Sequence, residues 1–500
     1  MRRVSLSWIA GLLSLATLFA RPAWAAPDPA HDLDARVREV FAAMGAGKCD
    51  PEGLRAIAGD PGFKELPSVI KSVTYATLVT CVGGASTEEW LNLATAEPDA
   101  PPFVWSLQFV EHVSLSRYDD ALADLETAAR LSGATGQPLG LERDDAVFHV
   151  RQKLQADLPR QRRFLSALDA GRWTPQDMTQ NPSSYWLDLS LMLMEAGQER
   201  EAARVARKVT KAADLFGMRL DKRFATLVST DPSLFDIEYA AFAELERQRK
   251  LQDQATTDNG VYEIIDALRT LGRFDEALAL ADRTLLKAQI VDSQGKDYRN
   301  WIEDRRAYVL LNMGRFDEAI AAERVAATRL ESGHANVSQV INLAEMLIGQ
   351  GKFRDALDLL PPMDKPGLTS PLGAAFVAEI RVCAYNGLGD EKAEREALAI
   401  TQTHVGDNRP ARLRALLCAN DIEGASAHMI GWLKDPMHRE DALVELSPAP
   451  DMPLGPFDAI LSKRFATVRR DPAVLAAVAQ VGHTERLSRI GGIWPSYPGS

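Results

Sequence analysis

The chain has 500 residues, of which 46% are hydrophobic, 25% are charged and 7% are aromatic, and its formal net charge at pH 7 is −12. This length can bury a large core or several cores in series. The acidic balance argues against non-specific binding to nucleic acid or to an anionic membrane face. Alanine and leucine dominate over the β-branched residues, which favours helix throughout the chain.

Residues 1–25 are predicted to be a signal peptide. Arg2 and Arg3 supply positive charge, an apolar run spans 8–19, and Ala23-Trp24-Ala25 forms a small-x-small cleavage site. Removal of this segment takes away three arginines and brings the net charge from −12 to −15. No later apolar run reaches the roughly 18 residues that a membrane-spanning helix needs. We therefore expect an exported protein, periplasmic or secreted, that uses the general secretory or the twin-arginine route.

Residues 26–251 are predicted to form divergent helical repeats. Two helix hairpins are expected near the start, 33–44 with 49–58 and 64–82 with 87–96. Further along, a charged helical region carries three arginines that we interpret as a solvated face rather than a binding patch: Arg160, Arg162 and Arg163.

Residues 252–446 contain one short phrase three times, each copy between two helical runs. Glycine adopts the left-handed conformation that ends a helix at little cost, so each phrase begins with a turn. The aromatic residue can wedge between the helices, the acidic residues suit the first turn of the second helix, and the small alanine permits close packing. The copies are Gly272-Arg-Phe274-Asp-Glu-Ala277, Gly314-Arg-Phe316-Asp-Glu-Ala319 and Gly351-Lys-Phe353-Arg-Asp-Ala356.

These residues resemble the tetratricopeptide repeat family. The glycines are 42 and 37 residues apart, whereas the family repeat has about 34. The resemblance implies an all-α fold, an α-solenoid of antiparallel helix hairpins with a concave groove, and a non-repeating helical bundle is the alternative. The matching residues are Leu343, Ala344, Leu347, Gly351, Phe353 and Ala356 in the third copy, and Trp186, Leu189, Ser190, Leu193, Gly197 and Ala202 in an earlier one. Weaker copies lie around Ser116, Gly389 and Asn420.

A second pattern is a near-duplication of residues 216–226 and 457–467. Both segments end in Lys-Arg-Phe-Ala-Thr, and both are followed by Asp-Pro, which is typical of a helix start. We interpret them as a recurring helix–loop–helix that closes a block of repeats. The alternative is that Lys222-Arg223 and Lys463-Arg464 are paired anion contacts. Between repeats and C-terminus we expect a proline-rich linker, 447–456, and then a helical cap and tail, 457–500.

The four cysteines all lie in the exported part, so disulfides are expected. Cys383 and Cys418 come near the ends of first helices in successive hairpins, which stack side by side. Cys49 lies at the turn between two early helices, and Cys81 lies near the end of the next helix. These positions favour the pairs Cys49–Cys81 and Cys383–Cys418, and four buried free thiols are the alternative.

The sequence carries no nucleophile elbow, HExxH motif, phosphate-binding glycine loop or CxxC pair. His428 and His438 are the histidines closest in sequence, but they do not share a helical face, so a metal site is not expected. We therefore expect no catalytic residue and no cofactor.

The candidate partner-binding residues lie on the expected first helices, on the side facing away from the packing leucines. Their aromatic and acidic mixture suits an extended peptide with apolar and basic side chains. The alternative is that Tyr262, Trp301 and Tyr308 pack against neighbouring helices. The predicted groove residues are Tyr262, Asp266, Arg269, Trp301, Asp304, Tyr308, Asn312 and Glu345.

The leading functional hypothesis is a non-catalytic scaffold, adaptor or assembly factor of the cell envelope that binds another envelope or secreted protein in this groove. One alternative is an enzyme that acts on envelope polymers through an unrecognised carboxylate site. Another is a structural spacer, which is favoured if the C-terminal segment fills the groove.

Overall fold

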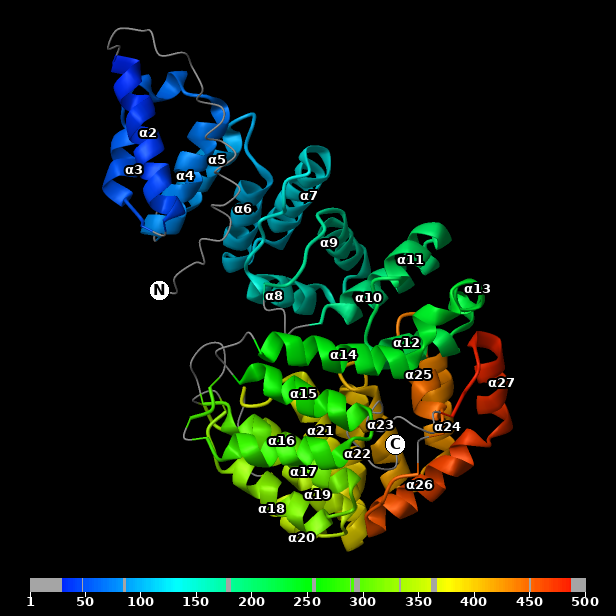
Figure 1. Ribbon diagram of the computed structural model, residues 1–500. Coiled ribbons are helices and arrows are strands. Elements are labelled where there is room, and N and C mark those ends of the chain that lie inside the picture. Colours follow the sequence, from blue (N-terminus) through cyan, green and yellow to red (C-terminus); the bar gives the residue numbers. More distant parts are fainter. Residues whose placement is uncertain are drawn as a thin grey trace. The chain divides into compact units, whose positions relative to one another are not determined.

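The computed structural model describes residues 29–46, 48–83, 87–176, 181–253, 258–287, 289–291, 297–331, 334–360, 367–448 and 451–486. Within these ranges the regular structure is helical, and only three isolated β-bridges occur (Figure 1). No described helix is both long and apolar enough to cross a membrane. The predicted signal peptide and the predicted tail beyond residue 486 lie outside the described residues.

The chain divides into two compact units, Met1–Asp177 and Met178–Ser500. In unit 1 the helices pack in neighbouring pairs, α4 with α5 and α6 with α7, and α4, α6 and α8 contact one another in turn. Its helices are α2 (Pro29–Gly45), α3 (Pro51–Ala58), η3 (Pro61–Glu65), α4 (Ser68–Val82), α5 (Thr87–Ala96), α6 (Pro102–Ser114), α7 (Tyr118–Thr135), α8 (Asp144–Leu154) and α9 (Leu158–Ala170).

Unit 2 continues the same architecture. It comprises α10 (Ser183–Glu195), α11 (Glu199–Ala206), α12 (Ala212–Leu220), η4 (Lys222–Phe224), α13 (Ala225–Thr230), η5 (Pro232–Phe235), α14 (Ile237–Gln252), α15 (Asn259–Thr270), α16 (Phe274–Leu285), α17 (Arg299–Asn312), α18 (Phe316–Ala327), α19 (Ser338–Gly349) and α20 (Phe353–Asp358). The remaining helices are α21 (Pro371–Leu388), α22 (Glu391–Thr403), α23 (Arg409–Cys418), α24 (Ile422–Leu433), α25 (Arg439–Leu446), α26 (Pro456–Arg469) and α27 (Pro472–Val481). First helices of successive pairs stack on one another, as α15 does on α17 and α19 does on α21. The predicted all-α solenoid of helix hairpins is confirmed.

The repeated phrase forms the same turn each time. Gly272, Gly314 and Gly351 have φ angles of 69°, 75° and 71°, in the left-handed region. The next residue donates its N–H to a carbonyl five positions earlier, at 2.9 Å in all three copies, which caps the first helix. The alanine of each copy is completely buried. The weaker copies place Ser116 and Asn420 at the glycine position, with φ angles of 60° and 54°.

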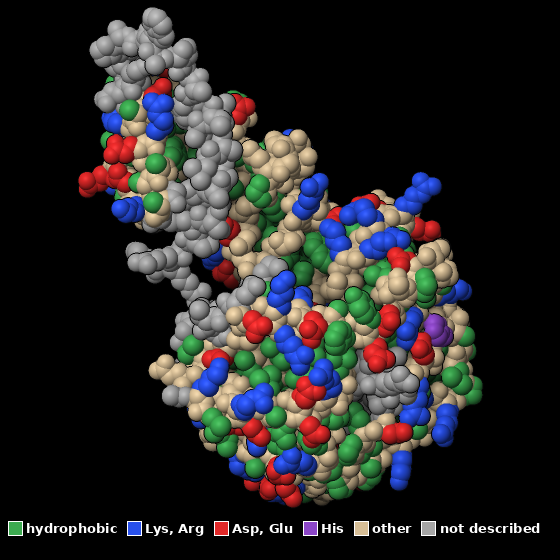
Figure 2. Space-filling model, in the orientation of Figure 1, with side chains coloured by type: hydrophobic (Ala, Val, Ile, Leu, Met, Phe, Trp, Pro, Cys, Tyr) green, Lys and Arg blue, Asp and Glu red, His purple; other side chains and the backbone are tan. Residues whose placement is uncertain are grey.

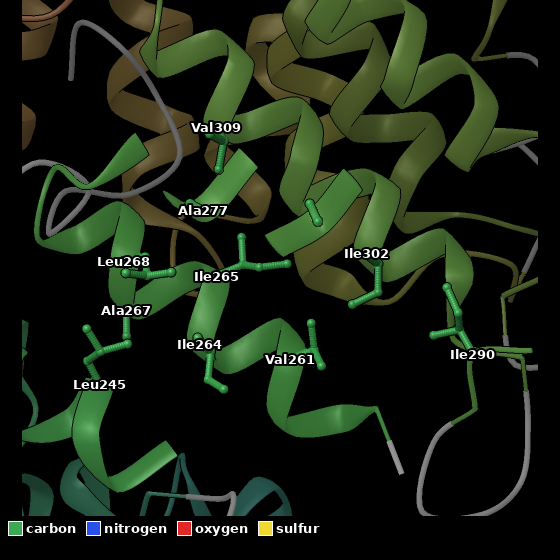
Figure 3. Close-up of a cluster of buried hydrophobic side chains, with 11 residues drawn as sticks. Leu245, Val261, Ile264, Ile265, Ala267, Leu268, Ala277, Ile290, Ile302 and Val309 are labelled. Carbon is green, nitrogen blue, oxygen red and sulfur yellow. The ribbon is translucent and has the colours of Figure 1, made fainter. Parts of the chain in front are cut away.

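A hydrophobic cluster joins α14, α15, α16 and α17 around the first copy of the phrase (Figure 3). Val261, Ile265 and Leu268 follow a helical spacing along α15 and are almost fully buried. Burial of each such aliphatic side chain is worth roughly 1.5–3 kcal/mol. This cluster fixes the orientation of α15 and α17, the two helices that carry most of the predicted groove residues.

The solenoid of unit 2 closes on itself, because α12 packs against α25 (Figure 1). At this seam Asp221 and Gly482 form an antiparallel bridge, and the His483 N–H donates to the Leu220 carbonyl at 3.1 Å. A Cβ on Gly482 would lie 2.1 Å from that carbonyl oxygen, so only glycine permits this approach. The buried Asp221 carboxylate accepts hydrogen bonds from Arg223 and, at 3.0 Å, from Arg439 Nε.

The duplicated segments share a pattern of burial but differ in secondary structure: residues 216–226 are divided between α12, η4 and α13, whereas 457–467 lie within α26. In both copies the lysine is exposed and the phenylalanine, Phe224 or Phe465, is fully buried. Arg223 donates to the Pro436 carbonyl at 2.6 Å, and Arg464 donates to the carbonyls of Leu417 and Cys418 at 2.7 and 2.8 Å. Each arginine therefore contacts the backbone of another part of unit 2. The predicted helix–loop–helix does not recur, because residues 457–467 form one continuous helix.

Both predicted disulfides are confirmed. Cys49–Cys81 joins the start of α3 to the end of α4 with a Cα–Cα distance of 5.7 Å. Cys383–Cys418 joins α21 to α23 with a Cα–Cα distance of 4.9 Å, and both of its residues are fully buried. All four cysteines of the chain lie in described segments and are disulfide-bonded.

The observed division differs from the predicted one. The boundary expected after residue 251 lies inside unit 2, where α14 and α15 pack together. The proline-rich stretch is also not simply a spacer: Pro453 lies against Gly314, and Gly455 lies against the Gly349 backbone. The α26 helix that follows packs on α19, α23 and α24.

The basic cluster of unit 1 is a solvated face. Arg160 pairs with Asp119 at 2.6 Å and Arg163 with Glu126 at 2.8 Å, and Arg162 is exposed. Figure 2 shows acidic and basic side chains interspersed over the visible surface of the molecule, without a large field of one sign.

Candidate functional site

The eight predicted groove residues all lie on first helices of three successive hairpins. Tyr262, Asp266 and Arg269 are on α15, Glu345 is on α19, and the others are on α17. Five of them are buried at 9% exposure or less: Arg269, Asp304, Tyr308, Asn312 and Glu345. Tyr262, Asp266 and Trp301 are half-buried. The predicted groove is therefore in large part an interior polar layer, and its role in partner binding stays a prediction.

The accessible part of this layer is an aromatic cluster. The ring centroids of Tyr262 and Trp301 lie 6.1 Å apart, and both rings also contact Tyr298, at 6.1 and 6.3 Å. All three rings are half-buried. Tyr298 is absent from the predicted set because it precedes α17, although its spacing of three residues from Trp301 places both on one side of a helical turn.

Arg305 organises the cluster and is also absent from the predicted set. Its guanidinium lies over the Tyr262 ring, 4.2 Å from the centroid, and donates a hydrogen bond to the Tyr262 hydroxyl. The same group contacts Asp304 at 3.2 Å and Asp266 at 3.7 Å. Burial lowers the Arg305 pKa to about 10, so the side chain is cationic at neutral pH. Arg305 thus covers one face of Tyr262 while two carboxylates hold it in place.

Behind Arg305 lies a buried carboxyl pair, Asp304 and Glu323. Asp304 accepts a hydrogen bond from Asn342 Nδ2 at 2.7 Å. Glu323 comes from α18 and is completely buried, and neither of its oxygens has a donor unless one carboxyl group of the pair is protonated. Burial is the main cause that raises the pKa of Asp304 to about 7 and that of Glu323 well above its usual value. The pair can therefore hold a proton at neutral pH.

A second buried network lies further along the first helices. Arg414 of α23 donates to Glu379 Oε1 of α21 at 2.9 Å and to Asp458 Oδ1 of α26 at 3.0 Å. Burial raises the pKa of Glu379 to about 7, and Glu345 is its next neighbour in the network. Phe457 packs edge-to-face against Phe353 at 5.0 Å. The first turn of α26 thereby packs against α20 and α23, and α26 also contacts α19.

Two further places offer functional groups. Glu379, Cys383 and Cys418 bring their ligand atoms within 4.8 Å of one another, but the disulfide leaves no thiolate there to bind a metal. A shallow depression of about 500 Å³ lies beside the α21–α22 turn, lined by Arg354, Tyr385, Leu388, Gly389, Asp390 and Glu391. None of its lining residues belongs to the predicted groove.

Comparisons with known proteins give little guidance. No family model and no curated protein matches the chain. Among solved structures, a "circular tandem repeat protein with novel repeat topology and enhanced subunit contact surfaces" aligns over 90% of this chain and 93% of its own length, at 14% identity. Its TM-score is 0.13, which does not establish a shared fold. The architecture therefore rests on the contacts within this chain.

Proposed function

We propose that the chain is an exported tetratricopeptide-like scaffold that binds a segment of another envelope or secreted protein without catalysing a reaction. The observation that carries the proposal is the half-buried aromatic cluster Tyr262, Tyr298 and Trp301, which spans two successive hairpins. Partly exposed aromatic rings next to paired charges are typical of binding hot spots. Asp266 beside the cluster favours a partner segment with apolar and basic side chains.

Export is part of the proposal. Its support is the sequence of residues 1–25 together with the two disulfides, which persist in oxidising compartments. Signal-peptide cleavage after Ala25 would be detected by N-terminal sequencing of the protein from its native host. A cytoplasmic protein that retains residues 1–25 would contradict this part.

The test for binding is site-specific photocrosslinking in the native host. A photoreactive phenylalanine analogue at position 301 should give a discrete adduct whose partner peptide is identified by mass spectrometry. The matched control places the same analogue at position 239, where Tyr239 of α14 is 66% exposed. The double variant Tyr262→Ala/Trp301→Ala should lose the partner, and Tyr239→Ala should keep it. Equal adducts at 301 and 239 would count against the cluster as the binding site.

A structural spacer is the second candidate, because α26 packs against α19, α20 and α23. This occupation limits the space for a partner to the part of the layer around Tyr262 and Trp301. The spacer hypothesis predicts that the Tyr262→Ala/Trp301→Ala variant functions in its host as the parent protein does.

A further inference from the structure

The Asp304–Glu323 pair connects the interior of unit 2 to the aromatic cluster through a continuous set of contacts. Asp304 contacts Arg305 at 3.2 Å, and Arg305 lies over Tyr262 and donates to its hydroxyl. On its other oxygen Asp304 accepts from Asn342 of α19. A change of charge on Asp304 therefore acts directly on the side chain that covers Tyr262.

Charge balance explains why a proton belongs in this site. Asp304 and Glu323 are 1% and 0% exposed, so two ionised carboxylates side by side would be strongly unfavourable. With one proton the pair carries a single negative charge, which matches the single positive charge of Arg305. The proton also gives Glu323 the hydrogen bond to Asp304 that its buried oxygens otherwise lack.

The other charged groups around the pair come from each packed helix. From α15 they are Asp266 and Arg269, from α19 Glu345, and from α17 itself Glu303 and Tyr308. On α16, Asp282 is occupied by Arg306 at 2.6 Å. Among the described residues, Arg305 is thus the cation that lies at ion-pair distance from Asp304.

We propose that Asp304 and Glu323 share one proton, and that a second proton on Asp304 releases Arg305 from Tyr262 and so adjusts the binding cluster to pH. When Asp304 becomes neutral, Arg305 loses its nearest ionic partner and its hold on the Tyr262 ring weakens. The uncovered ring then offers more surface to a basic or apolar segment. The effect on partner affinity rests on the proposed function, whereas the movement at Tyr262 does not.

The test uses the mature protein labelled with 3-fluorotyrosine and observed by ¹⁹F NMR without any partner. The nine tyrosines permit assignment of Tyr262 through the Tyr262→Phe variant. The Tyr262 resonance should shift with a midpoint near the raised Asp304 pKa of about 7. In Asp304→Asn the transition should disappear. In Glu323→Gln, whose neutral amide replaces the protonated carboxyl group as the donor to Asp304, the transition should remain, with its midpoint near that of the parent protein.

Glu318→Gln is the matched control, because Glu318 lies exposed on the same helix as Glu323 and pairs with Arg315. It should leave the midpoint unchanged. Arg305→Lys keeps the charge but not the planar group, so it should abolish the response of Tyr262 even if Glu323→Gln does not fold. A Tyr262 resonance that is independent of pH, a transition that persists in Asp304→Asn, or a midpoint displaced by more than about one unit in Glu323→Gln overturns the inference. Partner binding measured in parallel shows separately whether the proposed function fails.

Discussion

The two units are built from the same kind of helix hairpin. The ion pairs that stabilise the interior of each unit differ. In unit 1 most described ion pairs are exposed at the surface, as between Arg160 and Asp119, and the pair with both side chains buried is His112 with Asp124 at 2.6 Å. In unit 2 the inner layer contains arginines that each hold two or more buried carboxylates, such as Arg414 and Arg223. A linear stack can leave its charges in water. A stack that closes must bury the polar side chains on its inner side, and each of these then needs a partner.

The largest effect is expected from Arg414→Ala. This change leaves Glu379 and Asp458 buried without their cation, which should cost about 3–5 kcal/mol in the free energy of unfolding of unit 2. Urea denaturation followed by hydrogen exchange with mass spectrometry would report the loss for each unit separately. Unit 1 should be unaffected, and a loss of less than about 1 kcal/mol in unit 2 would show that this network does not hold α26.

The two disulfides allow the stabilities of the two units to be compared, because they close loops of similar length. Their cysteines are 32 and 35 residues apart, so chain entropy predicts nearly equal stabilisation of about 3–4 kcal/mol for each. Cys49→Ser/Cys81→Ser should lower the unfolding midpoint of unit 1 only, and Cys383→Ser/Cys418→Ser that of unit 2 only. Destabilisation of both units by either pair would show that they unfold as one body.

The pH dependence should separate the units as well. Burial raises the pKa of Glu445 in α25 from 4.5 to about 7, so the folded state keeps a proton that the unfolded chain releases. This contribution is complete below pH 4.5 and is lost as the pH rises to about 7, by on the order of 1–3 kcal/mol. In Glu445→Gln the free energy of unfolding of unit 2 should fall less steeply with pH over this range.

Unit 1 should respond less to pH in the same denaturation series. Its described carboxyl group with a comparably raised value is Asp124, whose pKa burial raises to about 6. If the free energy of unfolding fell more steeply with pH for unit 1 than for unit 2, the buried carboxyl groups with raised pKa values would not be concentrated in unit 2.

The smallest effect is expected from Arg163→Ala in unit 1. Its ion pair with Glu126 is 47% and 41% exposed, and pairs of this kind contribute about 1 kcal/mol or less. The measurement is the same urea denaturation, with Arg414→Ala as the reference. An effect equal to that of Arg414→Ala would remove the distinction between the two units.

Local patterns allowed the hairpins and the disulfides to be predicted. Each turn at Gly272, Gly314 and Gly351 depends on residues within one helical turn, and Cys383 and Cys418 lie on neighbouring hairpins. The duplicated Lys-Arg-Phe segments were interpretable only in part: both phenylalanines are buried, but the same residues break a helix at Asp221 and continue one in α26.

The closure of unit 2 could not be predicted in this way. The hydrogen bond between Arg439 and Asp221 spans 218 residues, and the ion pair between Arg219 and Glu485 spans 266. Glu323 likewise occurs in a helix whose first turn is acidic and exposed, so nothing local distinguishes it as a buried residue. Asp304 on α17 is buried by neighbouring helices, with Asn342 of α19 and Glu323 of α18 against it, whereas α19 is also covered by the distant α26.

The seam between α12 and α25 also limits how this protein can change in length. An open solenoid can gain or lose one hairpin, because each repeat contacts only its neighbours. In unit 2 an additional hairpin would separate Leu220 from His483 and Asp221 from Arg439. The number of hairpins in unit 2 is therefore set by geometry, and insertions or deletions of whole repeats should be tolerated in unit 1 but not in unit 2.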